Sequence, residues 1–304
     1  MALLDVILGY DCNLACSYCT ITPEMRAREL STQAVARAMR DAHAKGYREL
    51  SITGGEPTIR GDLLGLLRYA KKLGFDAIKL QSNGLVYRER VNVERLVAAG
   101  VSRFHVSIHT HEQAAYDAMV RRAGAWQMMR AGLSNLVEMG LDPVADVILE
   151  SSTAPRLTDA LTWLEGLGVM RADLWFVSLT DGNRDNVGSM PRMSDVMPQV
   201  HAAFALARDR GMTLRSLHLP HCVLGEDVGG AHDPAAASVM VVTPDDVFEL
   251  SGSKLTPQVY VPACEGCPSR PRCRGLRPDY LARFGDAEIA ALRGVPSSIP
   301  GQGA

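Results

Sequence analysis

The chain has 304 residues and a formal net charge of −2, with 47% apolar and 22% charged residues. These values are ordinary for a globular protein and allow one large α/β domain with a smaller appendage. Acidic and basic residues are interspersed, so the charge gives no sign of a nucleic-acid partner. No apolar run reaches the roughly 18–20 residues that span a bilayer, and the N-terminus lacks the features of a signal peptide. We therefore expect a cytoplasmic protein without a membrane partner.

Short apolar runs alternate with longer amphipathic segments along most of the chain, which is the pattern of βα repeats. The predicted strands lie at residues 3–9, 49–53, 76–82, 103–109, 144–150 and 173–179. Several helical stretches between them end in a glycine that suits a left-handed cap, and Ser31 and Asp62 suit the start of two helices. This alternation predicts an α/β fold, in which helices cover a parallel sheet that curves into an open, partial (β/α)6 barrel of the TIM type.

The βα pattern ends after a seventh helix-like stretch at residues 194–211. Residues 238–252 are then typical of a β-hairpin, and a segment rich in cysteine follows. We therefore divide the chain into an α/β core, residues 1–211, and a small C-terminal α+β domain with a tail, residues 212–304.

The seven cysteines fall into two groups. They are Cys12, Cys16 and Cys19, spaced C-x3-C-x2-C after the first strand, and Cys222, Cys264, Cys267 and Cys273. In a reducing compartment such groups hold metal more often than they form disulfides. Four thiolates close a zinc site or an iron–sulfur cube, whereas three leave one iron of a [4Fe–4S] cube open. From spacing alone, zinc remains an alternative for both groups, completed by a distant histidine in the first.

The other unusual residues also follow the predicted strands. The sequence GGEP (54–57) follows the second strand, Asn83 follows the third, and Ser107 and His109 close the fourth. Because the chemistry of parallel α/β barrels gathers at the C-terminal ends of the strands, we expect these residues to share one site with the first cysteines. Glu150, at the end of the fifth strand, is the candidate catalytic residue.

The C-x3-C-x2-C spacing, with an aromatic residue just before the last cysteine, resembles the radical S-adenosylmethionine (SAM) superfamily, and GGEP is similar to that superfamily's pattern. The resemblance covers about residues 3–180. It implies a [4Fe–4S] cluster on Cys12, Cys16 and Cys19 whose open iron binds the amine and carboxylate of SAM. One electron from a reductant such as flavodoxin or ferredoxin would cleave SAM to a 5′-deoxyadenosyl radical.

The same resemblance implies roles for residues around SAM. Glu56 would accept a hydrogen bond from the SAM amine, and glycines let the backbone approach a ligand closely. Tyr18 would lie near the adenine, while Ser107 and Asn83 would contact the ribose or the carboxylate. The complete set predicted to bind SAM is Tyr18, Gly54, Gly55, Glu56, Pro57, Asn83, Ser107, His109, Arg121 and Val177.

The second cysteine group looks like the auxiliary-cluster extensions of this superfamily, called twitch or SPASM domains. A full SPASM extension has more cysteines, so the four present here match the smaller twitch type with one auxiliary [4Fe–4S] cluster. Whether Cys222 is a ligand stays open at this stage.

An auxiliary cluster suits reactions that remove or return an electron after hydrogen abstraction. By analogy with the family, we expect modification of a peptide or protein during natural-product or cofactor biosynthesis. The alternative is a dehydrogenase, epimerase or cyclase that acts on a sugar, nucleotide or amino acid. The early start of the first strand, which leaves no room for a leader-binding domain, favours this alternative. A non-catalytic metal-binding protein is the third hypothesis.

Overall fold

A computed structural model describes residues 2–232, 237–252 and 259–293, so the predicted tail at 295–304 lies outside the described residues. In the described chain, nine strands form one sheet in the order β7-β6-β5-β4-β3-β2-β1-β8-β9. The strands are β1 Ala2–Ile7, β2 Glu49–Thr53, β3 Ala77–Ser82, β4 Arg103–Ser107, β5 Val144–Leu149, β6 Arg171–Phe176, β7 Thr213–Leu217, β8 Ser238–Val242 and β9 Val247–Glu249. Neighbours from β7 to β8 pair in parallel, and β9 pairs with β8 in antiparallel fashion.

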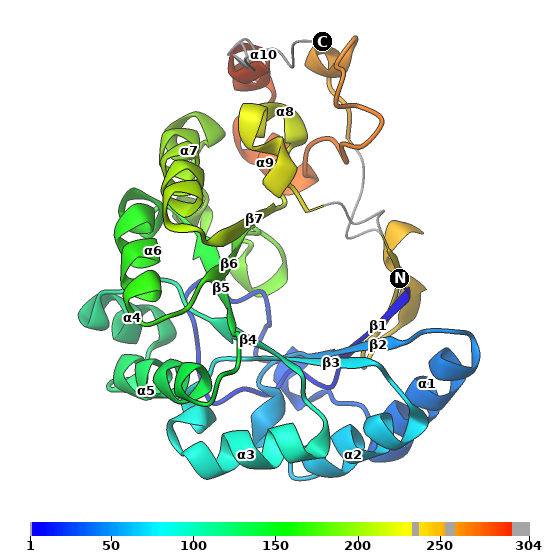
Figure 1. Cartoon of the computed structure of the whole chain (residues 1–304). Coiled ribbons are helices and arrows are strands. Elements are labelled where there is room, and N and C mark those ends of the chain that lie inside the picture. Colours follow the sequence, from blue (N-terminus) through cyan, green and yellow to red (C-terminus); the bar gives the residue numbers. More distant parts are fainter. Residues whose placement is uncertain (1, 233–236, 253–258, 294–304) are drawn as a thin grey trace, which may run out of the picture.

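Helices cover the outer side of the curved sheet, with α1 to α3 over one end and α4 to α7 over the other (Figure 1). The α-helices of the described part are α1 Thr32–Ala44, α2 Leu63–Leu73, α3 Arg90–Ala99, α4 Gln113–Val120, α5 Ala125–Glu138, α6 Leu157–Gly166, α7 Met193–Arg210, α8 His221–Leu224, α9 Pro278–Phe284 and α10 Ala287–Arg293. Short 3-10 helices lie at Met25–Ala27, Pro57–Ile59, Leu85–Arg88, Ala154–Arg156, Asp181–Asn183, Val187–Ser189, Gly225–Gly230, Leu250–Gly252 and Pro262–Cys264. No helix within these residues is long and apolar enough to cross a membrane.

The predicted parallel sheet and partial barrel are confirmed, and each predicted strand overlaps an observed one. The number of strands was predicted too low, because Thr213–Leu217 adds β7 beside β6. This strand escaped prediction since its inner face carries Arg215, so it lacks the continuous apolar run of a buried strand. The predicted hairpin forms from β8 and β9, and β8 extends the sheet beside β1. The division at residue 211 stays a prediction.

Local signals explain several helix ends. The hydroxyl of Ser31 accepts a hydrogen bond from the Ala34 N–H at 3.2 Å and caps α1 as predicted. Asp62 stands at the start of α2, but its carboxylate binds Arg60 and Thr32 instead of the helix backbone. Left-handed glycines end three of the helices, at Gly74, Gly100 and Gly211.

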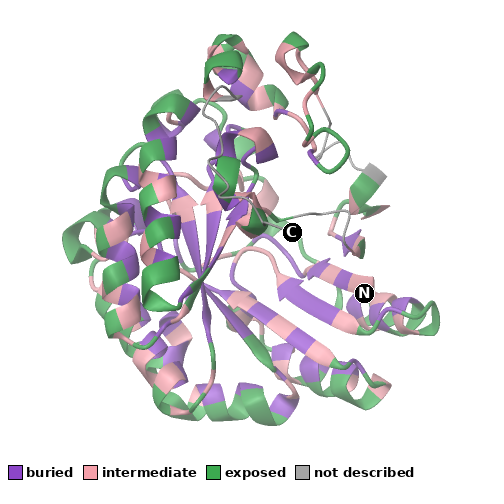
Figure 2. Ribbon diagram, turned by 45° about the horizontal axis from the view of Figure 1, so that its top comes forward, coloured by how far each residue is buried: buried purple, intermediate pink, exposed green. Residues whose placement is uncertain are grey.

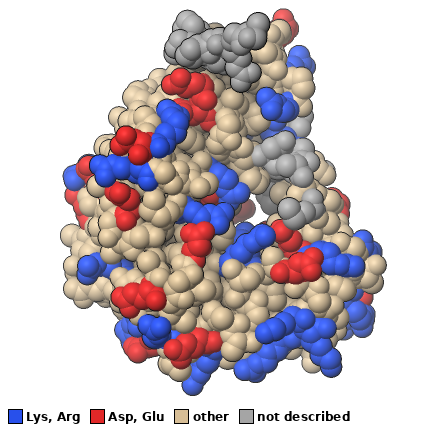
Figure 3. Space-filling view, in the orientation of Figure 1, with Lys and Arg blue, Asp and Glu red and all other residues tan. Residues whose placement is uncertain are grey.

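The two faces of the barrel strands differ in burial (Figure 2). Outward residues that pack against the helices, such as Leu4, Val6 and Leu80, are 0% exposed. Many inward residues are only partly buried, including Ile7, Thr53, Gln81, Ser107, Ile148, Trp175 and Arg215. Figure 3 shows an opening near the middle of the molecule with charged side chains of both signs beside it. The inner face of the barrel is therefore partly open to solvent.

Candidate functional site

The first three cysteines lie in the loop that follows β1, where they line a cavity of about 160 Å³ together with loops from β2, β3 and β4. The predicted residues that line it are Cys12, Cys16, Tyr18, Cys19, Gly54, Gly55, Asn83, Ser107 and His109. Glu56, Pro57, Arg121, Val177 and Glu150 do not line this cavity. The carboxyl ends of four neighbouring strands thus bring most of the predicted residues together.

Backbone hydrogen bonds hold the cysteine loop against the end of α4. The N–H of Ser17 donates to the Met119 carbonyl at 2.9 Å, and the Ala15 N–H donates to the Val120 carbonyl at 3.3 Å. The Arg26 guanidinium donates to the carbonyls of Cys12 and Leu14, at 2.9 and 2.7 Å. Arg26 was not predicted, because nothing in its local pattern marks a side chain that folds back onto the loop.

The thiols of this group fit the three-cysteine ligand set of an iron–sulfur cube. All three are free and face one cavity. Burial raises the pKa of Cys12 and raises that of Cys16 to about 12. Because metals bind thiolates, loading a cluster here must release protons.

The two glycines of GGEP are required by close backbone contact with the cysteine loop. A Cβ at Gly54 would lie 2.4 Å from the Gly9 carbonyl oxygen, and a Cβ at Gly55 would lie 2.0 Å from that of Asp11. Gly54 also has a φ of +136°, a conformation that side chains disfavour. These glycines join the loop after β2 to the loop after β1, in addition to facing the cavity.

Glu56 is 2% exposed and ties the loops after β2 and β3 together. Its Oε1 accepts hydrogen bonds from the Thr58 N–H, the Thr58 hydroxyl and the Ser82 hydroxyl, at 3.0, 2.6 and 2.9 Å. Its Oε2 accepts one from the Asn83 N–H at 2.7 Å. Burial raises the pKa of Glu56, and these hydrogen bonds oppose that shift. Oε2 has capacity for a further donor, so the predicted bond to the SAM amine stays a prediction.

Tyr18 is oriented by a histidine at the far side of the cavity. Its hydroxyl makes a short hydrogen bond to Nε2 of His109, whose ring stacks on Tyr116 with 6.0 Å between the ring centroids. Burial lowers the pKa of His109 to about 3, so the imidazole is neutral and its Nε2 accepts a hydrogen bond from the Tyr18 hydroxyl. The Nδ1 atom of His109 is buried and has no hydrogen-bond partner in the described chain.

The remaining predicted residues occupy varied places. The Asn83 side-chain amide donates to Oδ1 of Asn13 at 2.7 Å and so braces the cysteine loop. Arg121 adopts a left-handed conformation that ends α4. Val177 is 3% exposed just beyond β6, and Glu150 bonds the Ser152 hydroxyl at 2.5 Å. Their predicted roles stay predictions.

The four cysteines of the second group line a small cavity between α8 and the segment that precedes α9. Burial first, and then the nearby thiols of Cys273, Cys267 and Cys264, raise the pKa of Cys222 to about 12. Cys222 therefore lies among the other three, which the spacing left open.

The segment with these cysteines is anchored to the end of β6. The Arg277 guanidinium donates to the carbonyls of Phe176 and Val177 at 3.0 and 3.1 Å. The Asp279 carboxylate accepts from the Leu179 N–H at 2.9 Å. The second group is thus held at the same end of the barrel as the carboxyl ends of the strands.

Comparison with known proteins finds a family model and several relatives that are similar to this chain. Residues 6–149 match the family model of the radical SAM superfamily. The chain is 35% identical over 161 residues to a probable GTP 3',8-cyclase of Methanopyrus kandleri, and 29% identical over 212 residues to molybdenum cofactor biosynthesis protein 1 of Homo sapiens. These alignments cover 51% and 65% of this chain but 51% and 31% of the relatives, so the chain spans about half of their length or less.

Two solved structures resemble nearly the whole chain. Streptococcus suis SuiB bound to S-adenosylmethionine has a TM-score of 0.69 at 14% identity, covering 92% of this chain and 74% of that chain. Native anSMEcpe with bound AdoMet and a peptide has a TM-score of 0.69 at 12% identity, covering 95% and 96%. At this identity the likeness shows the fold alone. The family model covers residues 6–149, just under half of the chain, so this part of the chain is similar to the radical SAM superfamily.

Proposed function

We propose that this protein is a radical SAM enzyme that acts on a small molecule. The observation that carries the proposal is the cavity shared by Cys12, Cys16, Cys19 and the GGEP glycines. These thiols would hold three irons of a [4Fe–4S] cluster and leave the fourth for SAM. When bound and reduced by a flavodoxin or ferredoxin, this pair supplies a 5′-deoxyadenosyl radical.

The chain's own residues would orient and enclose the cofactor. His109 holds the Tyr18 ring beside the cavity, and Asn83 braces the cysteine loop through Asn13. Ser107, on the inner face of β4, lies where the ribose or carboxylate of SAM would be contacted. Oε2 of Glu56 would accept a hydrogen bond from the SAM amine.

We further propose an auxiliary [4Fe–4S] cluster on Cys222, Cys264, Cys267 and Cys273, within a twitch-like C-terminal domain. The convergence of the four thiols around one cavity supports it. A zinc ion on the same four thiols is the competing occupant. A fully ligated auxiliary cluster would relay electrons to or from the substrate.

The comparisons favour a small molecule over the peptide that we expected first from the family. The curated relatives include a probable GTP 3',8-cyclase, and they align at 29–35% identity. The neighbour with a bound peptide resembles this chain only in fold. A nucleotide, sugar or amino acid is therefore the proposed substrate class, and cyclisation, dehydrogenation or epimerisation is the proposed reaction.

Anaerobic reconstitution and a SAM cleavage assay test this proposal. Two cubes require about eight irons per chain. Dithionite should then release methionine and 5′-deoxyadenosine, at a rate increased by one member of a panel of nucleotides, sugars, amino acids and short peptides. About four irons with one tightly bound zinc would contradict the auxiliary cluster. Absence of SAM cleavage would favour the non-catalytic metal-binding protein, and stimulation by a peptide alone would return the substrate to the peptide class.

A further inference from the structure

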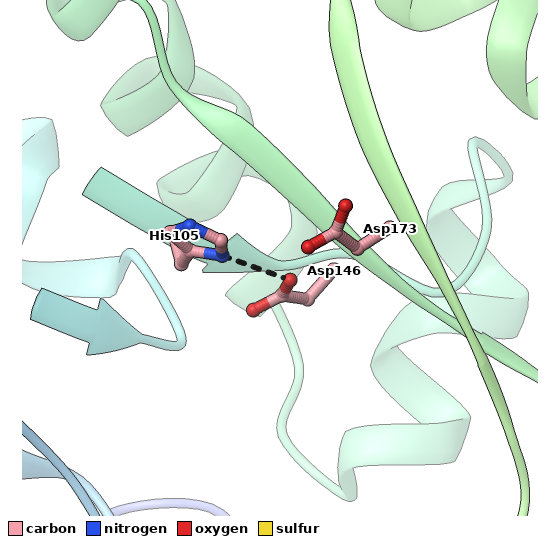
Figure 4. Close-up of side chains that lie close together, drawn as sticks. All are labelled: His105, Asp146 and Asp173. Atoms are coloured by element: carbon pink, nitrogen blue, oxygen red, sulfur yellow. Dashed lines mark hydrogen bonds and ion pairs between the residues drawn. The ribbon is translucent and has the colours of Figure 1, made fainter. Parts of the chain in front are cut away.

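Four polar side chains form a row across the inner face of the barrel, beside the cofactor cavity. This polar row consists of His105 on β4, Asp146 on β5, Asp173 on β6 and Arg215 on β7. Asp146, Asp173 and Arg215 are paired in register on neighbouring strands. His105, Asp146 and Asp173 are 7%, 2% and 3% exposed, and Figure 4 shows their side chains converging.

The carboxylate of Asp146 is only half satisfied. Its Oδ1 accepts hydrogen bonds from Nδ1 of His105 at 3.1 Å and from the Trp175 indole N–H at 3.2 Å. Its Oδ2 is buried and has no hydrogen-bond partner among the described residues. A buried oxygen left in this state is destabilising, so the arrangement calls for a hydrogen-bond donor from outside the chain.

His105 is set up to accept a hydrogen bond. In the neutral tautomer whose Nδ1–H donates to Asp146, the other ring nitrogen, Nε2, carries the lone pair. Figure 4 shows this nitrogen turned away from Asp146. A carboxylate that fixes a histidine in this way is the usual means of presenting its second nitrogen to a ligand.

Strand register places the polar row next to the cofactor cavity. His105 stands opposite Gln81 of β3, and Asp146 stands opposite Ser107 of β4. Both Gln81 and Ser107 line the cavity of the first cysteines. Neighbouring strands in a sheet lie about 4.8 Å apart, so a molecule in the cavity reaches the polar row if it extends by the spacing of one strand.

The charges of the row favour a donor-bearing ligand over a metal ion. Ligand atoms of His105, Asp146 and Asp173 lie within 4.8 Å of one another, as in a metal site. However, the Arg215 guanidinium already binds both oxygens of Asp173, at 2.8 and 2.5 Å, and would repel a second cation there. The hydrogen bonds of Arg215 go to Asp173, so Oδ2 of Asp146 is left as an acceptor, which favours a hydroxyl or ammonium group over a phosphate.

We propose that Nε2 of His105 and the carboxylate of Asp146 anchor the hydroxyl- or amine-bearing end of the small-molecule substrate inside the barrel. This inference rests on the proposed function, because it assumes a substrate beside bound SAM. Asp173 and Arg215 hold each other in place and complete the polar wall. Any phosphate of the substrate lies away from this row.

Equilibrium binding to the reconstituted, SAM-loaded protein without reductant tests the proposal. The probes are guanosine and glucosamine, each compared with its phosphorylated form, guanosine 5′-triphosphate and glucosamine 6-phosphate. At least one unphosphorylated probe should bind, and Asp146→Asn and His105→Phe should each weaken it tenfold or more. SAM affinity should stay within twofold. His43→Phe, a change of the same kind on α1 outside the barrel, is the matched control.

Several outcomes would overturn the inference. The first is that neither unphosphorylated probe binds, and the second is that both substitutions leave probe binding unchanged. The third is that the wild-type protein holds a metal other than iron and that Asp146→Asn loses this metal. Thermal melts show whether each variant folds. If His105→Phe does not fold, the isosteric Asp146→Asn carries the test. Failure of the proposed function shows separately, as absence of SAM cleavage by the wild-type protein with dithionite.

Discussion

The two cysteine groups are assembled in different ways. Cys12, Cys16 and Cys19 lie within eight residues of one loop, and that loop rests on the end of α4 through backbone hydrogen bonds. The second group joins Cys222 of α8 to a distant segment that Arg277 and Asp279 dock onto the residues at the end of β6. A site within one loop costs little loop-closure entropy, whereas a site built from separate segments depends on their tertiary docking. The first should therefore survive damage to the second.

The largest expected effect comes from removing the first group. Replacing Cys12, Cys16 and Cys19 together by Ala should abolish SAM cleavage, because no open iron then remains for SAM. Iron analysis should still find about four irons per chain on the second group. SAM cleavage at the wild-type rate in this triple variant would contradict the assignment of the first site.

The second group should be open to separate removal. Cys222→Ala deletes one of four converging thiols, so the iron content should fall from about eight toward about four per chain. Cleavage of SAM by dithionite without substrate should persist, since the first site is built independently. Cys273→Ala serves as the reference for loss of an undisputed member of the group. Full iron retention in Cys222→Ala alone would show that this thiol is not a ligand.

Glu56 tests how far the first site depends on its supporting loops. Glu56→Ala leaves the buried donors of Thr58, Ser82 and Asn83 without their acceptor. The free energy of unfolding should fall by about 3 kcal/mol or more, as measured by urea denaturation of the cluster-free protein. Glu112→Ala removes an exposed carboxylate that pairs with Arg156 and should cost less than about 1 kcal/mol. Equal losses in the two variants would contradict the structural role of Glu56.

The smallest effect concerns the pH dependence that His109 gives to the first site. Burial lowers its folded pKa to about 3, from 6.5 in the unfolded chain. Its stabilising contribution is therefore complete above pH 6.5 and is lost as the pH falls toward 3, because only the unfolded state then binds the proton. Between pH 7.5 and pH 5 the cluster-free protein should lose about 2 kcal/mol through this residue.

His109→Phe separates this titration from the hydrogen bond. The variant should lose about 1 kcal/mol at pH 7.5, since the Tyr18 hydroxyl loses its acceptor, but should depend less on pH. Urea unfolding at both pH values measures the difference. An unchanged pH dependence in the variant would show that His109 does not titrate as its burial requires.

Sequence patterns predicted the parallel sheet because strands buried on both sides leave apolar runs, and helices between them leave amphipathic ones. The same patterns missed β7, whose inward Arg215 breaks the run. They found nine of the residues that line the first cavity, since each lies at or beyond the C-terminal end of a predicted strand. They could not foresee Arg26 or Tyr116, which reach that cavity region through contacts between distant segments.

The sequence by itself determined which residues gather at the first site, because the three thiols and the GGEP turn lie on short segments whose spacing is visible in the chain. Only the tertiary structure decided that Cys222 meets the other three thiols, and that His105 and Asp146 adjoin the cofactor cavity. Those contacts join residues far apart in the chain, and strand register and docking, which no local pattern encodes, bring them together.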